Sequence, residues 1–183
     1  MRKIIGALNM TLDGICDHTA GMPDEGIHKH YTELLGQGGM ILYGRTTYKL
    51  MEFWRTVLEN PSEEKSMNDF AKAIDKIPKM VFSRTIKNVE WKSAALAKQD
   101  LKDEVLEIKQ QPGKDILVGS RSLIIQLLKL DLIDELQLCI YPMVEGKGLP
   151  FFENIDDRII FKLVKNKTFN NGAVILYYQP KDK

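Results

Sequence analysis

Short apolar runs alternate with segments of helical periodicity along nearly the whole chain, and this alternation limits the folds open to it. Most of the runs are continuous rather than alternating, as expected for strands buried on both faces of a parallel sheet. We interpret seven of them as strands: residues 3–8, 39–43, 79–82, 115–118, 135–141, 159–166 and 173–178. Strands that alternate with helices favour right-handed crossovers. The pattern therefore predicts the α/β class, with a mostly parallel central sheet flanked by helices.

The segments between these strands carry apolar residues at helical spacing. We predict helices around residues 27–35, 67–77, 101–106 and 123–128. Gly36 and Gly38 are typical stop signals for the first helix, and Asp100 is a candidate cap for the third.

The end of the chain departs from the parallel pattern. Its last two predicted strands are joined by Phe169-Asn170-Asn171-Gly172, and Asn-Gly is a strong signal for a hairpin. The sheet should therefore finish with an antiparallel hairpin, and we predict one domain over residues 1–183.

Charge and composition exclude several functional classes. The 183 residues include 26 basic and 25 acidic side chains, so the chain has no large field to attract nucleic acid or anionic lipid. Cys16 and Cys139 lie far apart without zinc-type spacing, so no metal site is expected. No run approaches the roughly 18 apolar residues of a membrane helix, and the first residues lack the apolar stretch of a signal peptide. We expect a cytoplasmic protein that binds a small molecule and neither nucleic acid nor a membrane, with a homodimer left open.

Similar clusters of glycine, arginine and hydroxyl residues follow three of the predicted strands. They are Gly44-Arg45-Thr46-Thr47, Ser83-Arg84-Thr85 and Gly119-Ser120-Arg121-Ser122, and the first and third begin with glycine. Ligands of open α/β sheets bind outside the carboxyl ends of the strands. Arginine has a planar fork of donors that suits phosphate, and glycine or a helix N-terminus brings backbone N–H groups close to an anion.

Three such clusters along one edge could hold a pyrophosphate and a third, separate phosphate. A third phosphate of this kind distinguishes NADPH from NADH. Each cluster alone is also compatible with an ordinary solvated turn, since serine and threonine favour turns. The fingerprint GxGxxG is absent, so a standard Rossmann site is not expected.

An ordered set of segments resembles the dihydrofolate-reductase-like family. The set comprises residues 7, 10–14, 44–48, 79–85, 116–120, 130–136, 141–148 and 151–152. It is most similar to small single-domain proteins related to the reductase domain of the bifunctional riboflavin-biosynthesis deaminase-reductase. The resemblance implies a mainly parallel sheet with NADPH bound along the carboxyl ends of its strands.

The resemblance also implies which residues contact the cofactor. It places the adenosine and 2′-phosphate near Arg45, Ser83, Arg84 and Thr85, the pyrophosphate near Gly44, Thr46, Gly119, Ser120 and Arg121, and the nicotinamide near Ala7.

Three departures from the family pattern bear on the substrate. Ser120 stands where the related folate enzymes have the second of two glycines, and no carboxylate matches their pterin anchor, because the position counted back from Gly44 falls near His28. Asp24 and Glu25 lie one turn earlier. The deaminase signature H-x-E…P-C-x-x-C is missing from this chain.

We therefore expect an NADPH-dependent reductase of a small heterocyclic or ribosyl-linked substrate. It would be similar to the riboflavin-pathway 5-amino-6-(5-phosphoribosylamino)uracil reductase. The alternatives are a non-catalytic nucleotide-binding or regulatory domain on the same fold, and a pterin or dihydrofolate reductase.

Two residues near the expected substrate cleft are candidates for proton transfer. Asp13, which the resemblance places in the loop after the first strand, is the first choice, with the alternative of a turn aspartate before Gly14. His28 is the second, since its ordinary pKa of about 6.5 suits proton transfer near neutral pH; it could equally be a polar residue on a half-exposed helix. His30 points to another helix face, so the two histidines should not share a metal.

Overall fold

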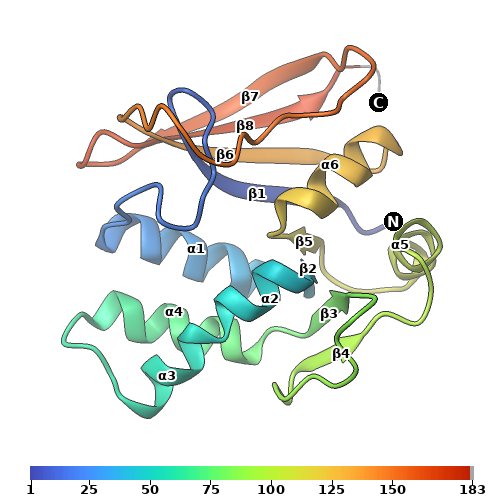
Figure 1. Cartoon of the computed structure of the whole chain (residues 1–183), viewed down its shortest axis with the longest axis horizontal. Helices are drawn as coiled ribbons and strands as arrows, with labels where there is room; N and C mark the ends of the chain where they lie inside the picture. Colours follow the sequence, from blue (N-terminus) through green and yellow to red (C-terminus); the bar gives the residue numbers. More distant parts are fainter. Residues whose placement is uncertain (182–183) are drawn as a thin grey trace.

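The computed structural model describes residues 1–181, and one eight-stranded sheet runs through them (Figure 1). Its strand order is β4-β3-β2-β5-β1-β6-β8-β7. The strands are β1 (Ile4–Thr11), β2 (Met40–Gly44), β3 (Lys79–Phe82), β4 (Ala94–Leu96), β5 (Ile116–Val118), β6 (Glu135–Tyr141), β7 (Phe161–Thr168) and β8 (Val174–Pro180). The strands from β4 to β6 in this order are parallel, and β8 is antiparallel to both β6 and β7. The predicted α/β class and its antiparallel end are confirmed.

Helices cover both faces of the sheet. They are α1 (Glu25–Gln37), α2 (Arg45–Met51), α3 (Phe53–Glu59), α4 (Lys65–Lys76), α5 (Leu101–Gln110) and α6 (Arg121–Lys129). Helices α1 and α4 pack together on one face, with α3 against α4, while α5 and α6 cover the other face (Figure 1). None of the helices within residues 1–181 is long and apolar enough to cross a membrane.

Burial on both faces explains why the strand segments are continuously apolar. Ile4 and Ile116 pack in the cluster under α5 and α6, whereas their neighbours Ile5 and Leu117 pack in the cluster under α1 and α4. Because successive side chains of a strand point to opposite faces, both sets must be apolar when both faces are covered.

Local signals in the sequence set several of the element ends. The Asp24 carboxylate accepts a hydrogen bond from the Ile27 amide at 2.9 Å and caps α1. The Asp100 carboxylate accepts one from the Asp103 amide and caps α5, as predicted. Gly172 adopts a φ of 83° in the turn between β7 and β8, a conformation that glycine adopts without steric cost. The predicted hairpin is confirmed.

Some boundaries differ from those predicted. Strand β1 continues to Thr11, beyond the predicted end at residue 8, because it pairs with β6 from Ile5 to Thr11. Strand β7 begins at residue 161 rather than 159. Strand β4 was not predicted, since three residues are too few to show a periodicity.

Candidate functional site

The carboxyl ends of four neighbouring strands bring the predicted clusters together. Strands β3, β2, β5 and β1 are adjacent and parallel, so their carboxyl ends share one edge of the sheet. Gly44 ends β2, Ser83 follows β3 and Gly119 follows β5. This is the part of an open α/β sheet where ligands bind.

One cavity of about 520 Å³ at this edge is lined by residues from all three clusters, with Ser122 from the third. We call it the arginine cavity. Gly44, Arg45, Thr46, Ser83 and Arg84 are part of its wall. Both arginines are exposed, so their guanidinium groups are accessible to an anion.

Hydrogen bonds fix the geometry of this wall. The Arg45 guanidinium donates to the Thr85 hydroxyl at 3.2 Å, which joins the start of α2 to the segment after β3. The Ser83 hydroxyl accepts hydrogen bonds from the amides of Thr85 and Ile86, at 3.2 and 2.9 Å. Ser83 therefore stabilises a local turn, as serine commonly does, and it also lines the arginine cavity.

The residues of the third cluster make different contacts. Ser120 is buried, and its hydroxyl accepts a hydrogen bond from the Gly44 amide at 2.8 Å, which ties the end of β5 to the end of β2. The Arg121 guanidinium donates to the Pro150 carbonyl at 2.6 Å and pairs with Glu153 at 2.6 Å. Arg121 is thus held by the loop after β6 and is not among the residues that line the arginine cavity.

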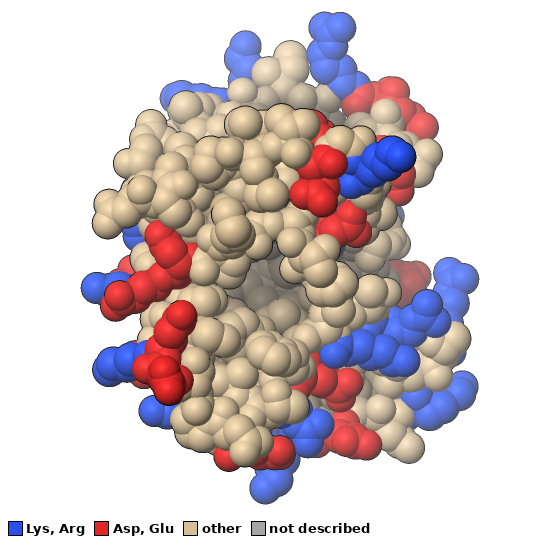
Figure 2. Space-filling view, turned by 60° about the vertical axis from the view of Figure 1, so that its left-hand side comes forward, with Lys and Arg blue, Asp and Glu red and all other residues tan. Residues whose placement is uncertain are grey.

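A second cavity, of about 180 Å³, lies at the same edge on the face covered by α1 and α4. We call it the uncharged cavity, because none of the residues in its wall is a lysine, arginine, histidine, aspartate or glutamate. Its wall includes Ala7, Asn9, Tyr31, Tyr43, Phe70 and Gly119. Figure 2 shows a face of the molecule that is hollowed at its centre, and the side chains around the hollow are uncharged.

The two cavities flank the end of β2. Tyr43 lines the uncharged cavity, and the next residue, Gly44, lines the arginine cavity. A ligand that filled both cavities would pass over the carboxyl ends of β2 and β5, where Gly119 has no side chain to obstruct it.

A neutral polar network forms one side of the uncharged cavity. The Tyr31 hydroxyl donates to Asn9 Oδ1 at 2.5 Å, and Asn9 Nδ2 donates to the Tyr141 hydroxyl at 3.5 Å. Burial raises the pKa of Tyr31 well above its ordinary value and also raises the pKa of Tyr141. Both hydroxyls therefore remain protonated and uncharged at neutral pH.

Asn9 and Tyr31 were not predicted as site residues. Asn9 is a polar side chain in an otherwise apolar strand segment, two residues after Ala7 and so on the same face of β1. That signal could have identified it. Tyr31 fits the apolar periodicity of α1, and nothing in the sequence separates it from a core residue.

Asp13 lies in the turn after β1, where it binds another loop. Its carboxylate accepts hydrogen bonds from the Thr11 hydroxyl and from the amides of Gly146 and Glu145, the last two at 2.8 and 3.2 Å. The Thr11 hydroxyl and these amides lower the pKa of Asp13 to about 2. Asp13 is therefore ionised at neutral pH and lines neither cavity, so the geometry favours a loop-holding role over proton donation.

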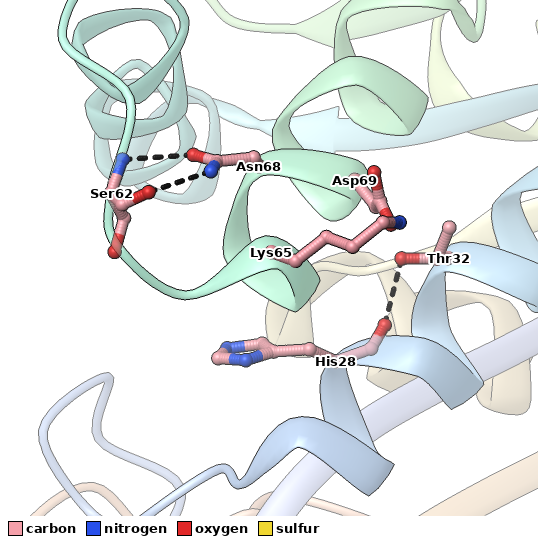
Figure 3. A network of polar contacts seen from close by, with 6 residues as sticks. All are labelled: His28, Thr32, Ser62, Lys65, Asn68 and Asp69. Carbon is pink, nitrogen blue, oxygen red and sulfur yellow. Dashed lines mark hydrogen bonds and ion pairs between the residues drawn. The ribbon is translucent and has the colours of Figure 1, made fainter.

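His28 packs among aromatic rings rather than in the wall of either cavity. Its ring centroid lies 5.9 Å from that of Trp54 and 6.2 Å from that of Phe70. Figure 3 shows the ring projecting from α1 beneath the segment that leads from α3 into α4, which Asn68 holds by hydrogen bonds to the backbone of Ser62. Burial lowers the pKa of His28, against the opposing effect of Glu64 and Asp24, so the imidazole is neutral at pH 7. This environment favours a packing role.

Comparison with known proteins identifies the family. The model of the RibD C-terminal domain matches residues 2–175. The chain belongs to the RibD C-terminal domain family. Two proteins of Bacillus subtilis (strain 168) are similar over 97% of this chain: the uncharacterized protein YyaP at 36% identity, covering 94% of its length, and the uncharacterized protein YwjB at 23%, covering 97%.

Solved structures show the same RibD-type fold. A putative riboflavin biosynthesis protein from Shewanella sp. PV-4 matches with a TM-score of 0.72 and 20% identity, over 98% of this chain and 99% of that one. A pyrimidine reductase-like protein from Corynebacterium diphtheriae gives 0.65 and 16%, over 100% and 93%. The Thermotoga maritima diaminohydroxyphosphoribosylaminopyrimidine deaminase/5-amino-6-(5-phosphoribosylamino)uracil reductase gives 0.63 and 15%, over 98% of this chain but 56% of that one.

This RibD C-terminal domain has no carboxylate in the wall of the uncharged cavity. Asp24, one of the two carboxylates nearest in sequence to the expected pterin anchor, caps α1 instead. Within residues 1–181 no three acidic, histidine or cysteine residues are grouped as a metal site would require.

Proposed function

We propose that this RibD C-terminal domain is an NADPH-dependent reductase of a small heterocyclic or ribosyl-linked compound. The observation that carries the proposal is the pair of cavities at one sheet edge, one lined by two arginines and the other uncharged. NADPH needs both environments, because its phosphates are anionic and its nicotinamide ring is planar and largely apolar. A named reductase and a reductase-like protein among the similar structures support the same reading.

The arginine cavity fits the 2′-phosphate of NADPH. Arg45 and Arg84 enter it from neighbouring strand ends, and Thr85 orients the Arg45 fork. A guanidinium binds a phosphate through two parallel charge-assisted hydrogen bonds. NADH lacks this phosphate, so these arginines would discriminate between the two nucleotides.

The uncharged cavity fits the reacting groups. When bound, the nicotinamide supplies a hydride to the carbon of a C=O or C=N bond, leaving NADP⁺. The heteroatom of that bond then needs one proton, which we assign to solvent because Asp13 and His28 line neither cavity. The chain contributes a short side chain at Ala7, apolar walls against which the nicotinamide ring can pack, and the Asn9 amide as a hydrogen-bond donor.

Nucleotide titration tests this proposal. NADPH fluorescence during titration of the purified protein should give a dissociation constant roughly tenfold to a hundredfold lower than that of NADH, since a hydrogen bond to a charged group contributes about 1.5–3 kcal/mol. Loss of NADPH absorbance with reducible heterocycles then measures turnover. Equal affinity for the two nucleotides would show that Arg45 and Arg84 do not bind the 2′-phosphate. If neither nucleotide bound, the alternative of a non-catalytic domain would be favoured.

A further inference from the structure

We infer that the substrate of the uncharged cavity is an uncharged ring compound that carries no phosphate. The inference rests on the proposed function, because it takes this cavity as the place of the reducible group. It also separates this chain from the Thermotoga maritima protein, whose name specifies a phosphoribosyl substrate.

The first argument is the absence of a cationic partner. No lysine, arginine or histidine is among the residues of the cavity wall, whereas the arginine cavity at the same sheet edge has Arg45 and Arg84. Burying an ion without a partner of opposite charge is strongly unfavourable. A phosphate or carboxylate placed in the uncharged cavity would therefore reduce the affinity of a ligand.

The ionisable groups around the cavity do not supply a charge at neutral pH either. Burial raises the pKa of Tyr31 and Tyr43, so both phenols stay protonated. His28, whose ring centroid is 6.2 Å from that of Phe70, is not among the residues of the wall, and burial keeps its imidazole neutral. On the face drawn in Figure 2, the side chains that directly border the central hollow are uncharged.

The second argument is the kind of contact that the wall offers. The rings of Tyr31, Tyr43 and Phe70 form flat apolar surfaces that suit a planar ring. Asn9 Nδ2 has two N–H groups, and among residues 1–181 only the Tyr141 hydroxyl accepts from it, at 3.5 Å. One N–H is left to donate to a ring carbonyl or ring nitrogen. The wall therefore recognises an uncharged ring with a hydrogen-bond acceptor.

Matched ligand pairs test the inference with the wild-type protein. The first pair is 5-amino-6-ribosylaminouracil and its 5′-phosphate, and the second is benzaldehyde and 4-carboxybenzaldehyde. Calorimetric binding to the nucleotide-free protein, together with turnover measured as NADPH oxidation, should favour the uncharged member of each pair by about tenfold or more. Calorimetry is done without nucleotide because the oxidised nicotinamide ring carries a positive charge that would itself attract the charged members. Equal or tighter binding of the charged members overturns the inference, as does no binding of either uncharged member.

Nucleotide affinity, measured first without substrate, separates this result from the proposed function. If neither NADPH nor NADP⁺ binds, the proposed function fails. If NADPH binds and the phosphorylated compound is preferred, the proposed function stands and only the present inference fails.

Paired variants provide a second test. Met51 lines the cavity from α2, and Leu50 beside it does not. Met51→Lys should reduce the preference for the uncharged ligand about tenfold, because it places a cation in the wall. Leu50→Lys adds the same charge on the same helix and should leave the preference unchanged. Equal effects of the two variants would show that general surface charge, rather than the wall, sets the preference.

Discussion

The arginine cavity and the uncharged cavity lie at one sheet edge but have walls of different chemistry. Two exposed arginines and a serine turn line the first, while aromatic rings and a neutral Asn9–Tyr31 pair line the second. The two cavities are separated by the end of β2, because the consecutive residues Tyr43 and Gly44 line different cavities. A single strand end thus separates a wall that contains charged side chains from one that contains none.

Removing a guanidinium from the arginine cavity should give the largest effect. Arg45→Ala and Arg84→Ala should each weaken NADPH binding roughly tenfold to a hundredfold, since a charge-assisted hydrogen bond contributes about 1.5–3 kcal/mol. NADH affinity should hardly change. Fluorescence titration with both nucleotides measures the ratio.

The control for these variants is Arg55→Ala. Arg55 pairs with Glu52 and Glu90 on the surface and lines neither cavity. If Arg55→Ala weakened NADPH binding as much as Arg45→Ala and Arg84→Ala do, the effect would come from net charge. The arginine cavity would then not be the site that binds the 2′-phosphate.

A side chain at Gly119 should affect the region where the cavities meet. A Cβ atom there would lie 3.0 Å from Cε1 of Tyr43, so Gly119→Val forces the Tyr43 ring to move. Overpacking of this kind costs about 1–3 kcal/mol. We expect NADPH and NADH to lose affinity together, by about tenfold. The control is Gly36→Ala, where an added Cβ meets no atom within 4 Å. If Gly119→Val reduced the affinity for NADPH alone, Gly119 would not lie where the two cavities meet.

Removing the Asp13 carboxylate should affect a loop and leave both cavities intact. The folded-state pKa of Asp13, about 2, lies below its ordinary 3.8. Its contribution is therefore complete above about pH 4 and is lost as the pH falls through about 2. Asp13→Asn should expose residues 143–149 to faster amide exchange at neutral pH and remove this acid dependence of the loop. Asp156→Asn, which removes a surface carboxylate that pairs with Lys129, should do neither.

The smallest effect is expected at His28. His28→Gln keeps a polar side chain of similar length next to Trp54 and Phe70, outside both cavities. The rate of hydride transfer on a verified substrate, and its pH profile between about pH 6 and pH 8, should stay close to wild type. A large loss of rate together with a changed pH profile would restore His28 as a proton donor.

The fold could be predicted because its main signal is local. Continuous apolar runs identify buried parallel strands, and the Asn171-Gly172 turn identifies the final hairpin. The proximity of the Gly44 and Ser83 clusters could be predicted in the same way, because each cluster lies at the carboxyl end of a predicted parallel strand. The role of Arg121 could not be predicted in this way. The direction of its side chain depends on Glu153 and Pro150, which lie in a loop distant in sequence.

The contacts that could not be predicted from the sequence are those whose partners lie far away along the chain. Asp13 resembles a catalytic or turn residue until the amides of Glu145 and Gly146 are seen to bind it. Asn9 resembles an irregularity in a strand until the Tyr31 hydroxyl reaches it from α1.

The position of β1 between β5 and β6 has a consequence for how the chain is made. Strand β1 pairs with β5 from Ile4 with Ile116 and with β6 from Ile5 with Glu135, so it has no partner in the sheet until β5 has been made. The pairings of β3 close shorter loops, with β2 at Ile41 and Lys79 and with β4 at Lys79 and Ala94. Closing the longer loop between β1 and β5 is slow because its entropy must be lost before the pairing stabilises it. Ala7 and Asn9 lie on β1 and Gly119 follows β5, so the wall of the uncharged cavity cannot be complete before these two distant strands have paired.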